Sequence, residues 1–253
     1  ASVRSSVVSH AKTLGYIPNS VRAPIAYVNV TLNNIGGLTS ATIPAGTIFN
    51  TVIDDVNYQF VTVAEHNALT VNGVLSFSNI PIHEGTYVTN RYTVDTDNVD
   101  QKFYVNDANG DTTTLLVDVF NTASSTSSTT FTQALDNTQV KSDSNVYFLQ
   151  ESVDGKFEVY FGDGIIGKAL SDGNIVRLRY VVTNKAAANG ASSFSTSATI
   201  TGITDITTAT VSSASGGAER ESIQSIKFNA PLDYAAQGRA VTVNDFKAIV
   251  PKV

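Results

Sequence analysis

Residues 162–169 (GDGIIGKA) come closer than any other segment to a motif that carries chemistry. Two glycines separated by four residues and followed by Lys168 have the spacing of a phosphate-binding loop. That loop needs Ser or Thr after the lysine to hold magnesium, and a helix whose N-terminus faces the phosphates. Ala169 stands there instead, and residues 171–174 (SDGN) predict a turn. We therefore interpret the segment as the tip of a structural β-hairpin, with the motif residues Phe161, Gly162, Asp163, Gly164 and Gly167.

The acidic and histidine residues select no metal or catalytic site. Residues 95–100 and 107–111 faintly resemble calcium loops, but glycine does not fall where an EF-hand loop requires it. The three histidines fit no metal-ligand spacing, and no Gly-x-Ser-x-Gly turn marks a nucleophile. We predict no catalytic, cofactor-binding or metal-binding residue, no cofactor and no small-molecule substrate.

The composition is that of a folded, weakly charged chain of 253 residues, of which 42% are hydrophobic and 15% charged. These values exclude a disordered chain kept open by its charge. No apolar run of about 20 residues is present, so we predict no membrane helix. Cysteine is absent, which excludes disulfides and thiolate sites. Methionine is absent too, from which we expect a fragment of a longer chain.

The net charge of −6 is unevenly distributed. Residues 1–53 carry 3 bases and no acid, residues 54–172 carry 5 bases and 17 acids, and residues 173–253 carry 8 bases and 5 acids. A nucleic-acid binder needs a concentrated basic face, so this pattern predicts no nucleic-acid partner. It fits head-to-tail contacts between copies or contacts with charged partners. It also fits an ordinary solvated surface.

Short strands joined by turn-rich segments predict a mainly β (α+β) chain with two small β sandwich- or barrel-like domains. Residues 26–32 alternate apolar with polar side chains, which is typical of a half-buried strand. Residues 43–49 (IPAGTIF) predict a strand with a Pro-Gly break. Further strands are expected at 58–63, 86–94, 114–120, 146–149, 157–161 and 175–182.

An N-terminal helix and a C-terminal helical segment are expected at the two ends. Ser2 is expected to cap the first helix and Gly15 to end it. Ala218 is expected to begin a second helix that stops before Pro231. Residues 242–245 are expected to cap a third, short helix. A lone helix of about 13 residues is marginal in water, so the first must pack on this chain's core or on another subunit.

Two hydroxyl-rich segments leave their structure open. Residues 121–132 contain nine Ser or Thr among twelve, and predict either a flexible loop or a polar hairpin. Residues 195–215 contain twelve among twenty-one, and we expect them to be extended and partly irregular.

We place an N-terminal helix and linker at 1–25, a first β domain at 26–95, a second β domain with the FGDG hairpin at 96–218, and a helical segment at 219–253.

Four segments, in order along nearly the whole chain, resemble the baseplate J-like family, and most closely its wedge subunits from contractile-tailed phages. The first is the entry helix with its Leu-Gly-Tyr-x-Pro sequence at 3–24, and the second is the Pro-x-Gly-Thr-x-Phe strand at 43–49. The third is the FGDG segment at 157–167 with the strand that follows, and the fourth is the tail at 216–250 (GGAERES…AP…RAVT…D).

The resemblance implies a structural subunit of a virion tail baseplate, assembled in the host cytoplasm. Such a subunit forms a ring around the tail hub, helps to anchor the sheath and transmits contraction. Its partners would be itself, as a dimer within the ring, other wedge proteins, and the sheath-initiating and hub proteins, with no membrane and no nucleic acid. Closing a ring needs two separate interfaces. We expect the terminal helices to supply one, through Val3, Val7, Leu14, Ile223, Ile226, Phe246 and Ile249.

Two rivals from other classes stay open at this point. A receptor-binding tail adhesin would share the β content, the hydroxyl-rich composition and the low charge. An enzyme would have to use residues 162–168 as a nucleotide site, or a carboxylate pair as a polysaccharide lyase or hydrolase does.

Overall fold

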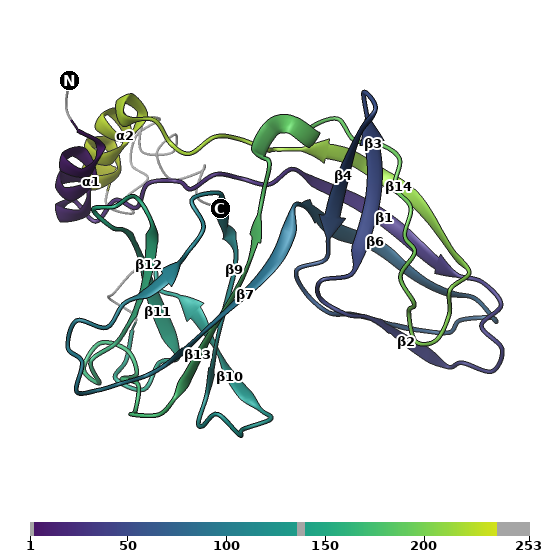
Figure 1. Ribbon diagram of the computed structural model, residues 1–253, viewed down its shortest axis with the longest axis horizontal. Coiled ribbons are helices and arrows are strands. Elements are labelled where there is room, and N and C mark those ends of the chain that lie inside the picture. The colour runs from purple at the N-terminus through teal and green to yellow at the C-terminus, as the bar shows by residue number, and fades with distance from the viewer. Residues whose placement is uncertain (1–2, 136–139, 237–253) are drawn as a thin grey trace.

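The computed structural model describes residues 3–135 and 140–236, which form two β units and a pair of helices. Figure 1 shows the β units side by side, with α1 and α2 packed together at one end. Two extended segments run side by side along the molecule and join this helix pair to the more distant β unit. The mainly β fold with a helix near each end is confirmed.

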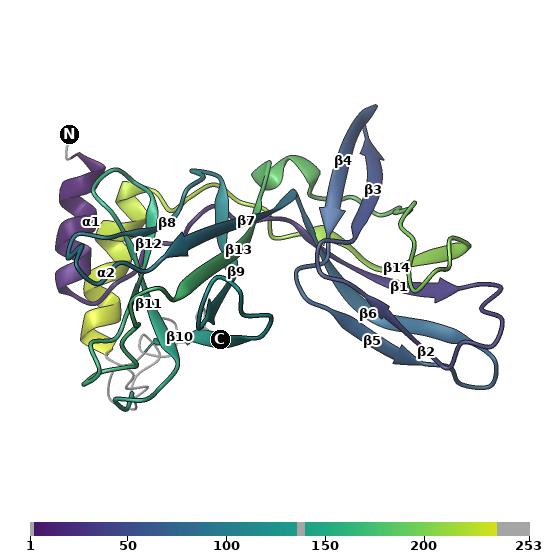
Figure 2. The same cartoon turned by 60° about the horizontal axis from the view of Figure 1, so that its bottom comes forward.

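The more distant unit is a curled five-stranded sheet that we call the half-barrel, with strand order β14-β1-β6-β4-β3. A two-stranded sheet of β2 and β5 accompanies it, as the turned view in Figure 2 shows. The bounds are β1 (Ile25–Leu32), β2 (Ser40–Ile43), β3 (Ile48–Ile53), β4 (Val56–Val61), β5 (His66–Leu69), β6 (Leu75–Glu84) and β14 (Ile206–Ser215).

The half-barrel core follows the alternation read from the sequence. In β1, Ala26, Val28, Val30 and Leu32 are buried and the residues between them are more exposed. The predicted Pro-Gly break separates β2 from β3. The segment between β13 and β14, which contains the short 3-10 helix η2 (Lys185–Ala188), also packs on this core. Its Phe194 lies edge-to-face on Phe60, with ring centroids 4.9 Å apart.

The second unit is a nearly closed seven-stranded sheet that we call the barrel, with strand order β7-β13-β9-β10-β11-β12-β8. Its two edge strands meet, because the Tyr92 hydroxyl donates to the Tyr104 carbonyl oxygen at 2.8 Å. The interior is apolar and aromatic. The bounds are β7 (Thr86–Thr93), β8 (Phe103–Val105), β9 (Gly110–Phe120), β10 (Ser128–Gln133), β11 (Val146–Glu151), β12 (Phe157–Phe161) and β13 (Ile175–Val182).

Two strands pair across the domain boundaries that we placed from the sequence. β7, which falls within 26–95, pairs along its whole length with β13 of the barrel. β14, which falls within 96–218, pairs with β1 of the half-barrel. The chain therefore passes between the two units more than once, and their sheets are built from interleaved segments.

Both hydroxyl-rich segments have a structure that the sequence analysis allowed. Residues 121–132 contain the turn and second strand of the β9–β10 hairpin, so the polar-hairpin alternative is correct. Residues 195–205 are irregular apart from short bridges, and β14 is extended, as expected. β14 nevertheless has little apolar alternation, because most of its side chains are exposed on both faces of an edge strand.

The helices differ from the prediction in their ends. Helix α1 spans Arg4–Thr13, and Gly15 follows it with φ of +77°, as expected of a helix-ending glycine. Helix α2 spans Ile223–Ala236, so a start at Ala218 is wrong and Pro231 lies inside the helix. The N-cap of α1 is Val3, so the expected cap at Ser2 is wrong. The short helix expected from 242 lies outside the described residues.

The second helix starts late because the segment before it is held extended. Ala218 forms a two-way backbone bridge with Arg22, and the amide of Glu221 donates to the carbonyl of Asn19. The helix continues through Pro231 because Ala230 and Ala236 are buried on either side of it. The burial of these two residues compensates for the helix hydrogen bond that is lost because proline has no backbone N–H.

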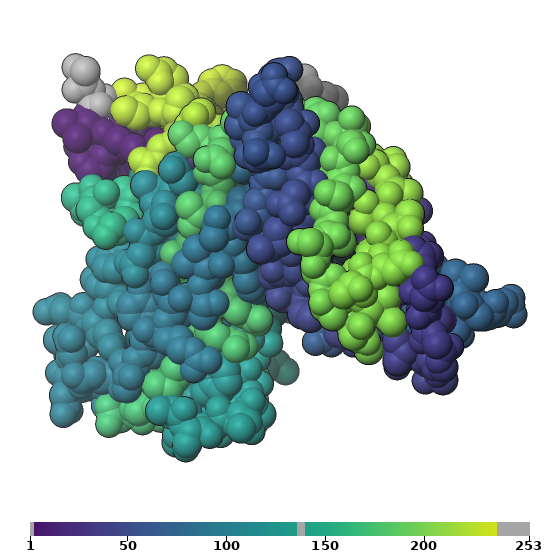
Figure 3. Space-filling view, turned by 45° about the vertical axis from the view of Figure 1, so that its right-hand side comes forward, coloured from purple at the N-terminus to yellow at the C-terminus, as the bar shows by residue number. Residues whose placement is uncertain are grey.

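The two β units meet where β6 passes directly into β7 at Gly85. Glu84 is 0% exposed, and its carboxylate accepts hydrogen bonds from Thr183 Oγ1 at 2.6 Å and from the amide and side chain of Asn184 at 2.8 and 2.7 Å. Gly85 has φ of +129°, and a Cβ there would lie 2.2 Å from the Val182 carbonyl oxygen. Figure 3 shows the two units in contact in the upper part of the view and separated by a notch below.

We expect Gly85→Ala to lower the free energy of unfolding by roughly 2–5 kcal/mol, because a Cβ adds both backbone strain and a clash with Val182. Chemical denaturation measures the change. Gly190→Ala is the matched control, since Gly190 also has positive φ but no atom lies within 4 Å of the added Cβ. The control should cost about 1–2 kcal/mol. Equal losses in the two variants would show that the close approach at Gly85 is unimportant.

Candidate interaction surfaces

The FGDG segment is a rigid turn rather than the tip of a hairpin. β12 before it pairs with β11 and β8, whereas β13 after it pairs with β7 and β9, so the predicted hairpin pairing is wrong. Asp163 accepts hydrogen bonds from the amides of Ile165 and Ile166 at 2.9 and 3.0 Å. A Cβ on Gly162 would lie 2.2 Å from the backbone of Gly167, so any side chain at position 162 would clash. Gly164 and Gly167 have φ of +85° and +83°.

The same segment lacks the geometry of a phosphate-binding loop. Residues 168–174 form no helix, so no helix N-terminus faces the space in front of the turn. Within residues 3–135 and 140–236, no three His, Cys, Asp or Glu side chains are grouped as metal ligands would be. No helix in these ranges has the length and apolarity to cross a membrane.

The helix pair brings together most of the residues that we predicted as an interface. Val7 of α1 and Ile226 of α2 are buried against each other's helix, and Leu14 and Ile223 are partly buried in the same cluster. Val3 is 67% exposed. Phe246 and Ile249 lie outside the described residues. The buried members hold the helices together within this chain, and contact with another subunit through this set stays a prediction.

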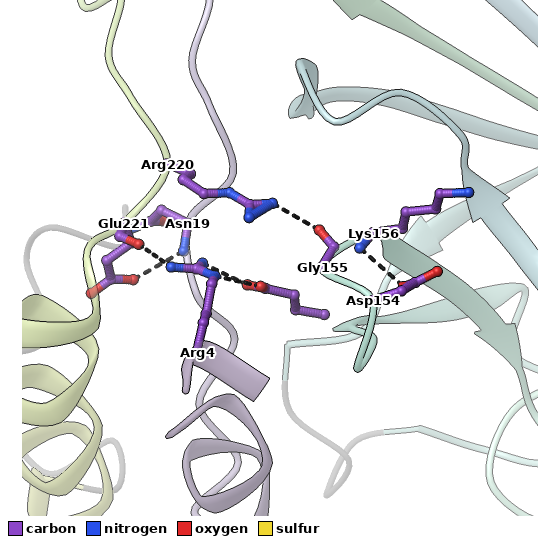
Figure 4. A network of polar contacts seen from close by, with 8 residues as sticks. Arg4, Asn19, Asp154, Gly155, Lys156, Arg220 and Glu221 are labelled. Carbon is purple, nitrogen blue, oxygen red and sulfur yellow. Dashed lines mark hydrogen bonds and ion pairs between the residues drawn. The ribbon is translucent and has the colours of Figure 1, made fainter. Parts of the chain in front are cut away.

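A polar network fastens the helix pair to the barrel, as Figure 4 shows. The guanidinium of Arg4 donates two hydrogen bonds to the Glu151 carboxylate of β11, at 2.6 and 2.8 Å, and a third to the Glu221 carbonyl at 2.5 Å. Arg220 donates to the Gly155 carbonyl at 2.8 Å. The bidentate Arg4–Glu151 pair is largely buried, with 1% of the Glu151 side chain and 19% of the Arg4 side chain exposed.

Glu221 is the centre of the same network. Its carboxylate accepts hydrogen bonds from the Asn19 amide at 3.0 Å, the Tyr16 hydroxyl at 2.8 Å and the Ser225 hydroxyl at 2.7 Å. Burial acts to raise the pKa of Glu221, but these hydrogen bonds outweigh it and hold the pKa below its ordinary value. Burial first, and then the bond to Glu221, raise the pKa of Tyr16. The carboxylate of Glu221 thus joins α2 to the linker between α1 and β1, while its backbone carbonyl binds Arg4 of α1.

The uneven charge along the chain is partly neutralised within the fold. Arg4, from the basic first segment, pairs with Glu151 from the acidic middle. Arg177 and Arg179, from the basic last segment, pair with Asp118 at 2.9 and 2.7 Å. Burial acts to raise the pKa of Asp118, but the arginines and a hydrogen bond from a threonine hydroxyl hold it below its ordinary value. Sequence reasoning did not weigh pairing between segments of one chain.

Helix α2 also carries a second apolar stripe that the sequence analysis missed. Phe228, Pro231 and Leu232 lie at i, i+3 and i+4, the spacing of one helix face. Phe228 is 69% exposed and Leu232 is 43% exposed, so this face points away from the buried contact with α1. The spacing was readable from the sequence, but the expectation that the helix would end before Pro231 concealed it.

Comparisons with known proteins match this chain to phage tail proteins. Residues 88–192 match a family model described as bacteriophage baseplate wedge protein gp6, third domain. The chain is 27% identical to baseplate wedge protein gp6 of Enterobacteria phage T4, in an alignment of 286 residues that covers 99% of this chain. The chain spans 40% of that relative's length. It is therefore gp6-like over nearly all its residues, and the predicted resemblance to wedge subunits is confirmed.

We expect stability to fall on acidification as the carboxylates with lowered pKa become protonated. The folded-state pKa of Glu221 lies below its ordinary value of 4.5, so its stabilisation is complete above that pH and is lost as pH falls through the folded pKa. In denaturation between about pH 7 and pH 2.5, Glu221→Gln should be less stable than wild type at neutral pH and should lose less stability on acidification. Glu65→Gln, at an exposed position, is the control and should follow wild type. Parallel pH curves for Glu221→Gln and wild type would contradict the assignment.

Proposed function

We propose that this gp6-like chain is a structural part of a phage tail baseplate wedge. In this role it would form a ring around the tail hub with other copies, help to anchor the sheath and transmit its contraction. The observation that carries the proposal is the similarity to gp6 along 99% of the chain, including the match of residues 88–192 to the third domain of that protein.

The architecture supports a structural role. Glu84 and Gly85 hold the two β units against each other. The Arg4 and Glu221 network holds the helix pair against the barrel. A subunit built in this way keeps its surfaces in a fixed relation, which an assembly under mechanical load requires.

The partners would be other baseplate proteins. We propose contacts with a second copy of the chain, with other wedge proteins, and with the hub and sheath-initiating proteins, in a virion component that assembles in the host cytoplasm. The exposed face of α2 is the apolar helix face available for a wedge partner among the described residues, because Phe228 and Leu232 point into solvent. Apolar anchors of this spacing suit a groove on a partner protein.

Incorporation into baseplates tests the proposal. A tagged chain expressed in infected cells should co-purify with tails and with baseplate intermediates. Phe228→Ser with Leu232→Ser should reduce incorporation by about tenfold or more, since interface anchors contribute most of the binding energy. Val153→Ser is the matched control, because Val153 is 82% exposed and lies outside α2.

Unchanged thermal melting would show that the α2 variant still folds. Absence of the wild-type chain from purified baseplates would rule out the structural role. Normal incorporation of the folded α2 variant would remove only the helix face from the proposal.

A further inference from the structure

A row of charged side chains crosses the outer face of the barrel. Cross-strand register places Arg91 of β7 opposite Arg177 of β13, and Arg177 opposite Asp118 of β9. Arg179 lies on the same face as Arg177, because side chains two residues apart in a strand share a face. We call Arg91, Arg177 and Arg179 the arginine patch.

The arginine patch has more positive charge than the fold neutralises. Asp118 accepts from both Arg177 and Arg179, and among the described residues it is the one carboxylate in an ion pair with the patch. Arg91 contributes a cation–π contact instead, with its guanidinium carbon 5.2 Å from the centroid of the Phe120 ring. Like charges directly opposite each other in a sheet are destabilising. Three arginines against one carboxylate therefore leave a patch that a further anionic group would stabilise.

The patch is also ordered before any partner arrives. The guanidinium carbon of Arg177 lies 4.8 Å from the centroid of the same Phe120 ring, so one ring contacts two guanidinium groups. The Nε of Arg179 is buried without a hydrogen-bond partner among the described residues. Arginines fixed on an aromatic ring lose little side-chain freedom when they bind a carboxylate.

An acidic loop with the opposite charge begins two residues after β7 ends. Asp95, Asp97 and Asp100 are all exposed, and none forms an ion pair within the described part of the chain. We call residues 95–100 the acidic loop. Val99 within it is 92% exposed, which provides an apolar contact among the acids.

The acidic loop is held in one conformation by its own hydrogen bonds. The side chain of Gln101 accepts from the Asp95 amide at 3.0 Å and donates to the Thr93 carbonyl at 2.7 Å. The amide of Asp97 donates to the Asp95 carboxylate at 3.1 Å. A preformed loop and a preformed patch reduce the entropy that binding would cost.

We propose that the arginine patch of one copy of this chain binds the acidic loop of a second copy, and that the reverse contact forms at the same time. Arg91 and Asp95 are four residues apart, roughly 13 Å along an extended chain, so the two surfaces are neighbours of opposite charge. Two neighbouring surfaces of opposite charge are self-complementary about a twofold axis, which is the geometry of a symmetric dimer. This inference deepens the proposed structural role and rests on it, since it names one contact between copies within a baseplate.

Sedimentation velocity of the 253-residue chain tests the proposal. We expect a dimer that grows with protein concentration at about 50 mM salt and weakens by about tenfold or more at about 500 mM salt, because solvent-exposed charges are screened. Arg91→Glu and Asp97→Lys should each weaken the dimer by about tenfold or more. Neither residue forms an ion pair in the described structure, so both variants should still fold, which a cooperative thermal transition would show.

The double variant is the decisive measurement. Arg91→Glu combined with Asp97→Lys exchanges the two charges and should recover at least part of the lost affinity. Lys12→Glu is the control, since it changes the charge by the same amount at an exposed position on α1 and should leave the dimer unchanged.

A chain that stays monomeric at every concentration would overturn the proposal, as would a dimer that neither single variant weakens. A double variant as weak as the single variants would also overturn it. If the chain is monomeric and Arg91→Glu weakens binding to another baseplate protein, the patch belongs to that partner and the second copy is excluded. The test uses the isolated chain, so its failure leaves incorporation into baseplates to decide the structural role separately.

Discussion

Buried carboxylates that accept hydrogen bonds from distant segments are the constraint on which this structure depends. Glu84 binds the segment that leaves β13, and Asp111 accepts the amide of Ala23 at 2.7 Å, which fixes the linker that leads into β1. Glu221 fixes the start of the same linker through Asn19. An unpaired carboxylate in such a place costs several kcal/mol, so moving one of these segments away from its carboxylate would destabilise the fold. These three groups help to fix the helices, the barrel and the half-barrel relative to one another.

Local patterns in the sequence were sufficient for the elements that carry their own signal. The alternation in residues 26–32 predicted β1 and its buried face, since a half-buried strand has to repeat every two residues. The Pro-Gly pair in residues 43–49 predicted the break between β2 and β3, and Gly15 marked the end of α1. The motifs that ran in order through the chain predicted its similarity to wedge proteins.

Features set by contacts between distant segments could not be read in the same way. β14 is rich in Ser and Thr and has no clear apolar face, so no pattern in its own sequence indicates that it pairs with β1. The late start of α2 depends on backbone bonds from the linker near Asn19. The buried acids are the clearest case, because Asp and Glu are almost never fully buried unless paired. The backbone amides that Asp111, Glu84 and Glu221 hold lie 88, 100 and 202 residues away.

The placement of charge connects this internal construction to contacts between subunits. Cations that the fold needs for itself are paired with buried carboxylates, as Arg4 is with Glu151. Such pairs are poorly screened by salt, and breaking one would leave a buried charge alone. Arg91 and the acids of residues 95–100 are exposed and form no ion pair within the described residues, so their interactions respond to salt and to partners. In the proposed wedge role, a change in salt or partner would therefore alter the exposed charges before it disturbed the buried pairs that hold the subunit's own parts together.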